Sequence, residues 1–196
     1  MVEELINPNV KGKQSVMNID VESLGEAADQ NIMASSSDQE KVILEEPVRG
    51  RVIGMELILN NQLRVNDSDI SKKYYPVRLM VSTEFEDPKT GDKVISRDGF
   101  GGLRFYPAFD ESGNVKLKEN GEPVLDHFWF NSPSSKQASG FSILFGRAQD
   151  FDSTILSASK LFKFLNSNPN CMLLTEYTAF QGEDLKPKQV IQSFVE

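Results

Sequence analysis

Aromatic and basic side chains are interleaved between Phe100 and Phe145, where nine of the eighteen aromatic residues of the chain occur. The two densest pieces are Gly99–Tyr106 (GFGGLRFY) and His127–Asn131 (HFWFN). Aromatic rings on the outer face of a sheet can stack on flat ligands, and the bases of single-stranded nucleic acids are common partners of this kind. Neighbouring arginines could then contact the phosphates.

If both pieces are strands, the period of two places alternate side chains on opposite faces. One face of each strand is then wholly apolar, with Leu103 and Phe105 in the first strand and Phe128 and Phe130 in the second. The other face is mixed and carries Arg104, Tyr106, His127, Trp129 and Asn131. The pattern predicts a sheet that buries one face and presents large rings beside polar groups on the other.

We therefore predict a nucleic-acid-binding groove lined by basic and aromatic residues. Its predicted members are Arg97, Phe100, Arg104, Tyr106, Trp129 and Lys136. The competing interpretation makes Tyr106 and Trp129 ordinary core or interface residues, because half-buried aromatics are usual in sheets. The sequence leaves both interpretations open.

Enzyme motifs fail in this chain, and we predict a non-enzymatic protein without a cofactor. Gly140-Phe-Ser-Ile-Leu144 lacks the second glycine of a nucleophile elbow. Gly99-Phe-Gly-Gly-Leu-Arg104 begins like a dinucleotide fingerprint but ends in arginine, among predicted hairpins. His127 is the sole histidine and Cys171 the sole cysteine, and we predict no metal site.

Charge divides the chain into an acidic N-terminal part and a nearly neutral remainder. Residues 1–46 carry ten acidic residues against three lysines, a net charge of −7. Residues 47–196 carry nineteen acidic and eighteen basic residues, a net charge of −1. We predict a disordered-like acidic arm over 1–46 that is dispensable for folding, and a β-rich binding domain over 47–196. A neutral domain argues against binding long duplex DNA by bulk charge.

Most of the remaining sequence has strand and turn patterns. Strands are predicted over 51–59, 76–85, 93–96, 102–106, 124–131, 141–145 and 172–180, with turns at 87–92, 111–114 and 119–122. Residues 190–195 are expected to form a last strand or a short docked helix. One helix is predicted after Asp152 or Ser153, where Ile155, Ala158, Leu161, Phe162 and Leu165 form an apolar stripe that Asn168-Pro169 ends. The fold class expected is mainly β, a small antiparallel OB-like barrel or a sandwich with one helix in the C-terminal half.

These features give two functional hypotheses. The first is a single-stranded nucleic-acid-binding protein that uses aromatic stacking and a local basic groove, with the acidic arm competing for the groove or recruiting proteins. The combination of β-barrel, exposed aromatics and acidic tail resembles phage-type OB-fold single-strand-binding proteins, although those carry their acidic segment at the C-terminus. The second is a structural assembly subunit, of a virion or another large complex, whose arm lies across neighbouring copies.

Partners and location follow from the same observations. No apolar run approaches the roughly 18 residues of a membrane-spanning helix, and the N-terminus lacks the pattern of a signal peptide. We expect a cytoplasmic protein, in the host cytoplasm if viral, with no membrane partner. The sequence leaves oligomeric state open, a homo-oligomer included, and also the choice between DNA and RNA.

Overall fold

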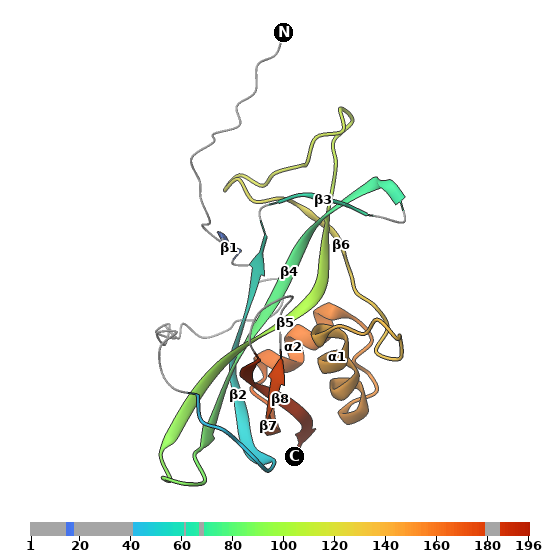
Figure 1. Cartoon of the computed structure of the whole chain (residues 1–196). Helices are drawn as coiled ribbons and strands as arrows, with labels where there is room; N and C mark the ends of the chain where they lie inside the picture. The colour runs from blue at the N-terminus through green and yellow to red at the C-terminus, as the bar shows by residue number, and fades with distance from the viewer. Residues whose placement is uncertain (1–14, 18–40, 61, 67–68, 179–184) are drawn as a thin grey trace.

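Long antiparallel strands form the sheet that organises the chain. The computed structural model describes residues 15–17, 41–60, 62–66, 69–178 and 185–196 (Figure 1). Their sheet follows the order β6-β5-β4-β2-β7-β8, and β1 and β3 pair with β2 and β4. The strands are β1 (Ser15–Met17), β2 (Val48–Leu59), β3 (Arg64–Asn66), β4 (Asp69–Glu86), β5 (Lys93–Pro107), β6 (Leu125–Trp129), β7 (Asn170–Thr178) and β8 (Lys186–Val195).

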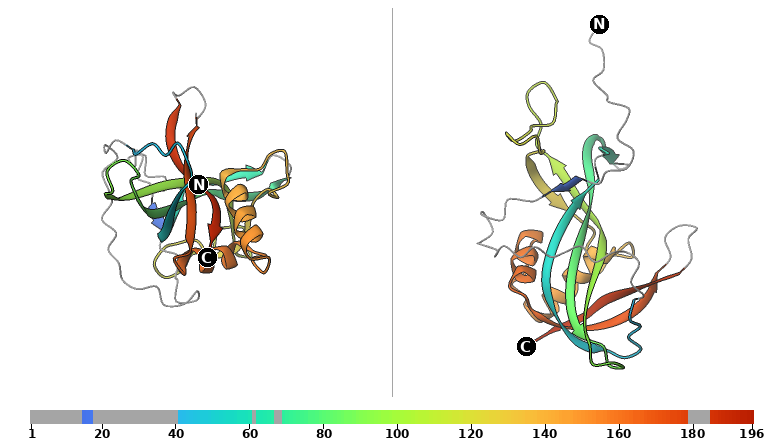
Figure 2. Two further views of the ribbon diagram at one scale, coloured as in Figure 1. Left: turned by 90° about the horizontal axis from the view of Figure 1, so that it is seen from below. Right: turned by 90° about the vertical axis from the view of Figure 1, so that its left-hand side faces the viewer.

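The fold class is mainly β, as predicted, but the sheet is not a closed barrel. Strands β6 and β8 stand at the two ends of its hydrogen-bonded order. Two helices, α1 (Gly140–Phe151) and α2 (Ala158–Asn166), lie together beside the lower half of the sheet in Figure 1. Helix α1 contacts β5 and β8, and α2 contacts β2. The views in Figure 2 show β7 and β8 crossing the long strands at a steep angle.

The core lies between the sheet and the helices. Side chains from every layer are fully buried there, among them Leu79, Phe105, Phe141, Phe162 and Leu173. The inward positions predicted in β4 are confirmed, because Val77, Leu79, Val81 and Phe85 are all buried. Ser82, expected on the outward face, is buried as well. The upper part of the molecule in Figure 1, where β3, β4, β5 and β6 meet, extends beyond the helices.

The prediction of a strand over 141–145 is wrong, because this segment begins helix α1. Ser139 is the N-cap, and its side chain accepts a hydrogen bond from the Ser142 backbone N–H. Phe141, Leu144, Phe145 and Ala148 are buried, at the i, i+3, i+4, i+7 spacing of a helix face. A window that ends at residue 145 shows an apolar run without its period, and this made the segment look like a strand.

The predicted C-terminal helix exists, but it begins later than expected. Ser157 is its N-cap, and its side-chain oxygen accepts from the Lys160 backbone N–H at 3.3 Å. Asp152, predicted to cap this helix, instead stands at the C-terminal end of α1. The end of the helix is as predicted, with Asn168 in a left-handed conformation just before Pro169.

The segment that precedes β2 packs into the fold before the expected boundary at residue 47. Leu44 is 1% exposed and belongs to the core. Its backbone N–H donates to Thr175 Oγ1 at 2.8 Å, and its carbonyl accepts from the Thr175 N–H at 3.2 Å. The folded part of the chain therefore includes residues 41–46, which the charge pattern had placed with the acidic arm.

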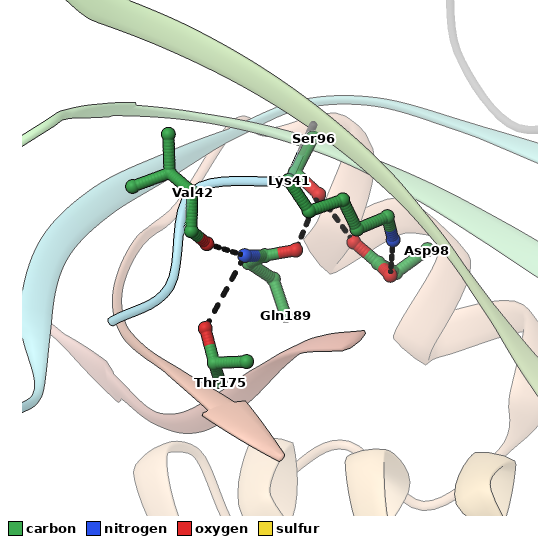
Figure 3. A network of polar contacts seen from close by, with 6 residues as sticks. All are labelled: Lys41, Val42, Ser96, Asp98, Thr175 and Gln189. Atoms are coloured by element: carbon green, nitrogen blue, oxygen red, sulfur yellow. Dashed lines mark hydrogen bonds and ion pairs between the residues drawn. The ribbon is translucent and has the colours of Figure 1, made fainter. Parts of the chain in front are cut away.

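A polar network fixes residues 41 and 42 between β5 and the β7–β8 hairpin (Figure 3). Lys41 Nζ donates to Asp98 Oδ1 at 2.6 Å, and the Ser96 hydroxyl lies 2.5 Å from the other carboxylate oxygen. Gln189 Nε2 donates to the Val42 carbonyl at 2.6 Å, while Gln189 Oε1 lies 3.0 Å from Ser96 Oγ. These contacts join strands that are far apart in the order of the sheet, because β5 and β8 are separated by β4, β2 and β7.

Cys171 should be unreactive in the native protein. The side chain is buried in β7, and burial raises the pKa of its thiol to about 12. Because the thiolate is the reactive form, both access and ionisation are suppressed. We expect an aromatic disulfide reagent at pH 8 to modify the native chain at least ~100-fold more slowly than the urea-unfolded chain. Equal rates would show that β7 is not packed as described.

Candidate nucleic-acid interface

Five side chains gather on the outer face of β4, β5 and β6, and we call this set the aromatic face. Its members are Tyr74, Arg104, Tyr106, His127 and Trp129. The register explains the grouping, since Arg104 pairs with Trp129 and Tyr106 with His127 across β5 and β6. Tyr75, Phe105 and Phe128, at the intervening positions, pack toward the core. The predicted separation of apolar and mixed faces is confirmed in both strands.

A bulge in β5 determines which side chains reach this face. Leu79 pairs with Phe100, but the next same-face residue of β4, Val77, pairs with Leu103, so β5 has an extra residue here. Phe100 and Leu103 consequently both point to the core, where they are 4% and 1% exposed. After the bulge, Arg104 and Tyr106 point outward. Gly102, in a left-handed conformation with φ of 99°, makes this change of face.

Arg104 lies between two aromatic rings. Its guanidinium carbon is 4.7 Å from the centroid of Tyr74 and 4.6 Å from that of Trp129. The two rings come from β4 and β6, the neighbours of β5 on either side. Trp129 remains 41% exposed. Two cation–π contacts thus hold the arginine and leave much of the indole open to solvent.

Tyr106 is buried beneath its neighbours, and it offers no free ring face. It is 6% exposed, and its ring is stacked on His127 with centroids 4.7 Å apart and an angle of 5° between planes. The centroid of the Tyr74 ring lies 5.7 Å from that of Tyr106, and the Tyr106 hydroxyl accepts from Asn66 Nδ2 at 2.9 Å. Tyr106 therefore supports the aromatic face, which agrees with its interpretation as a core or interface residue more than with direct stacking on a ligand.

The other three predicted groove residues lie apart from the aromatic face. Phe100 packs in the core on the opposite face of β5, where Lys188 Nζ covers its ring at 4.2 Å. Burial also lowers the pKa of Lys188. Arg97 is on the outer face but forms an ion pair with Glu56. Lys136 is exposed in the loop between β6 and α1.

Sequence reasoning missed Tyr74 because it began the strand at Pro76, whereas β4 begins at Asp69. The signal was present, since Tyr74 precedes the predicted strand in phase with its outward residue Arg78.

Charged side chains surround the aromatic face. Arg78 is exposed, and Arg64, the register partner of Tyr74 in β3, is exposed as well. An acidic neighbour is Asp126, whose Oδ2 lies 2.7 Å from His127 Nδ1. Arginines therefore flank the aromatic face on the β3–β4 side.

Within the described part of the chain, no group of three or more His, Cys, Asp or Glu residues gathers as a metal site would need. None of the helices described is long and apolar enough to cross a membrane. Comparison of the chain with protein-family models, curated proteins and solved structures gives no match.

Proposed function

We propose that this chain is a non-enzymatic single-stranded nucleic-acid-binding protein that uses the aromatic face as its contact surface. The observation that carries the proposal is Trp129, a large ring that stays 41% exposed on the end strand of the sheet. One face of its indole meets Arg104, and the remaining surface can stack on a base. Exposed Arg64 and Arg78 supply charge for phosphates nearby.

Single strands fit this surface better than duplexes. Bases in a duplex are already stacked, whereas the unpaired bases of a single strand can lie on an aromatic ring. The nearly neutral charge of residues 47–196 argues for a few local phosphate contacts. A cytoplasmic location, in the host cell if the chain is viral, is part of the same proposal.

The proposal predicts a measurable cost of removing the indole. Trp129→Ala should weaken binding of a fluorescent oligothymidine about 5- to 150-fold, the range expected for one lost base stack. Fluorescence anisotropy measures the affinity, and quenching of the sole tryptophan by unlabelled oligothymidine should accompany binding to the unmodified chain. Two or three phosphate contacts should give a log–log salt slope of about −1.4 to −2.1.

Tyr177→Ala provides the matched control. Tyr177 is 56% exposed on β7, away from the aromatic face, so its removal should leave the affinity unchanged. Equal losses in both variants would contradict a specific surface. Absence of binding by the unmodified chain at every salt concentration would contradict the function itself.

A structural assembly subunit is the second candidate function, and one observation favours it. Strand β1 (Ser15–Met17) adds to β2 at Leu57–Leu59, so the N-terminal region can supply a strand to a sheet edge. The same type of pairing can join neighbouring copies of a subunit. Analytical sedimentation of the chain alone tests it, because a subunit should self-assemble without oligonucleotide and lose assembly when residues 1–40 are deleted.

A further inference from the structure

The Arg104 guanidinium lies close to two aromatic rings, and no polar partner for it is found among the described residues. Tyr74 and Trp129 contact it from neighbouring strands. A guanidinium is planar, and its five N–H donors lie in that plane. The contacts with the two rings provide no oxygen or nitrogen acceptor for these donors, so the donors remain available. Among the described residues, no hydrogen bond or ion pair engages Arg104.

Four other arginines of the chain use acceptors within the protein, whereas the exposed Arg64 and Arg78 have none among the described residues. Arg97 pairs with Glu56, and Arg51 Nε donates to the Asn168 carbonyl at 3.1 Å. Arg49 and Arg147 donate to backbone carbonyls of Glu196 and Ile191. All four side chains have acceptors within the protein, although two of them, Arg49 and Arg51, lie on exposed surface. Arg104 is partly buried and contacts two rings, yet it has no such acceptor among the described residues, as expected for a group that binds an external acceptor.

We propose that Arg104 and Trp129 form a one-nucleotide subsite, an inference that rests on the proposed function. The edge of the Arg104 guanidinium binds a backbone phosphate through two parallel N–H···O hydrogen bonds, the geometry in which arginine recognises phosphate. The base beside that phosphate stacks on the surface of the indole that Arg104 leaves uncovered. Tyr74 and the stacked Tyr106–His127 pair act as positioning residues that maintain the orientation of the Arg104 guanidinium and the Trp129 indole.

The subsite predicts different effects for two substitutions in the full chain. Arg104→Gln removes the charge and the fork, and should weaken oligothymidine binding about 10- to 100-fold while making the salt slope shallower by about 0.7. Arg104→Lys keeps a charge but loses the planar fork. It should lose most of the affinity while keeping the slope of the unmodified chain. Arg51→Gln, on the distant part of the sheet, is the control and should change neither quantity.

A neutral oligonucleotide separates a phosphate contact from a structural effect of the substitution. Oligothymidine with methylphosphonate linkages keeps the bases and removes the backbone charge. The unmodified chain should bind it at least ~10-fold more weakly than the phosphodiester, and Arg104→Gln should show a smaller difference between the two ligands. Tryptophan emission of each variant without ligand shows whether Trp129 keeps its surroundings.

Three outcomes would overturn the subsite. If Arg104→Gln binds the phosphodiester oligothymidine as tightly as the unmodified chain does, the phosphate contact of Arg104 is excluded. If Arg104→Gln prefers the phosphodiester over the methylphosphonate as strongly as the unmodified chain does, the phosphate binds elsewhere. The proposed function would then stand without the subsite. Equally tight binding of inorganic phosphate or thymidine monophosphate would indicate a small-anion site. If the unmodified chain binds neither oligonucleotide, the proposed function fails together with the subsite.

Discussion

Gly102→Ala should lower the free energy of unfolding by about 2–5 kcal/mol, a large part of the total stability of a typical domain. Gly102 has a φ of 99°, a conformation that an L-residue with a side chain rarely adopts. A methyl group at this position would also overlap the Oγ and Cβ atoms of Ser139. Ser139 is the N-cap of α1, so relief of the overlap would disturb the start of that helix.

Gly101→Ala is the matched control for this prediction. Gly101 is the neighbouring residue, and a methyl group there meets no atom within 4 Å. Its substitution should change stability by less than about 1 kcal/mol. Urea unfolding followed by circular dichroism measures both variants. If both are equally stable, the bulge is not required by the packing of α1 against β5.

The same bulge links the stability of the fold to the proposed interface. Phe100 points to the core before it, and Arg104 points outward after it. A regular strand would place residues 100, 102, 104 and 106 on one face, which would turn Arg104 and Tyr106 toward the core. Gly102→Ala should therefore also weaken oligonucleotide binding in whatever fraction remains folded.

Local alternation was enough to predict the aromatic face within each strand. Leu103 and Phe105 separate from Arg104 and Tyr106 because no irregularity interrupts those four residues. Regular alternation places Phe100 on the same face as Arg104 and Tyr106, and for this reason its assignment to the groove was wrong. The change of face at Gly102 depends on a positive φ and on α1, neither of which is visible in sequence. Which side chains pack together across strands depends on register, and register was not predicted.

Long-range packing also explains the other differences between expectation and structure. The Tyr74–Arg104–Trp129 arrangement joins three strands, and residue 74 lay outside the predicted strand. Composition placed Leu44 in the acidic arm because Glu45 and Glu46 follow it. Its burial depends on Thr175, which is 131 positions away in sequence. A charge count cannot detect a contact of that kind.

The second large effect concerns residues 41–46. The free energy of unfolding should be lower by about 3 kcal/mol or more for a chain that begins at residue 47 than for one that begins at residue 41. Loss of a fully buried leucine alone typically costs about 2–5 kcal/mol. The deletion also removes the Val42 carbonyl that accepts from Gln189 and the Lys41 ammonium that pairs with Asp98. Asp98 is only 5% exposed, so its carboxylate would lose a close charged partner in a place that water reaches poorly.

Thermal unfolding of the two truncated chains measures this contribution, since both lack residues 1–40 and differ only in residues 41–46. The midpoint of the shorter chain should be lower by roughly 6–12 °C, at about 2–4 °C per kcal/mol for a chain of this size. Leu44→Ala in the full chain should reproduce most of the loss, whereas Glu45→Ala, at an exposed position, should have little effect. Equal midpoints for the two truncated chains would show that the fold begins at residue 47 after all, and that the network joining β5 to β8 holds without the segment that it encloses.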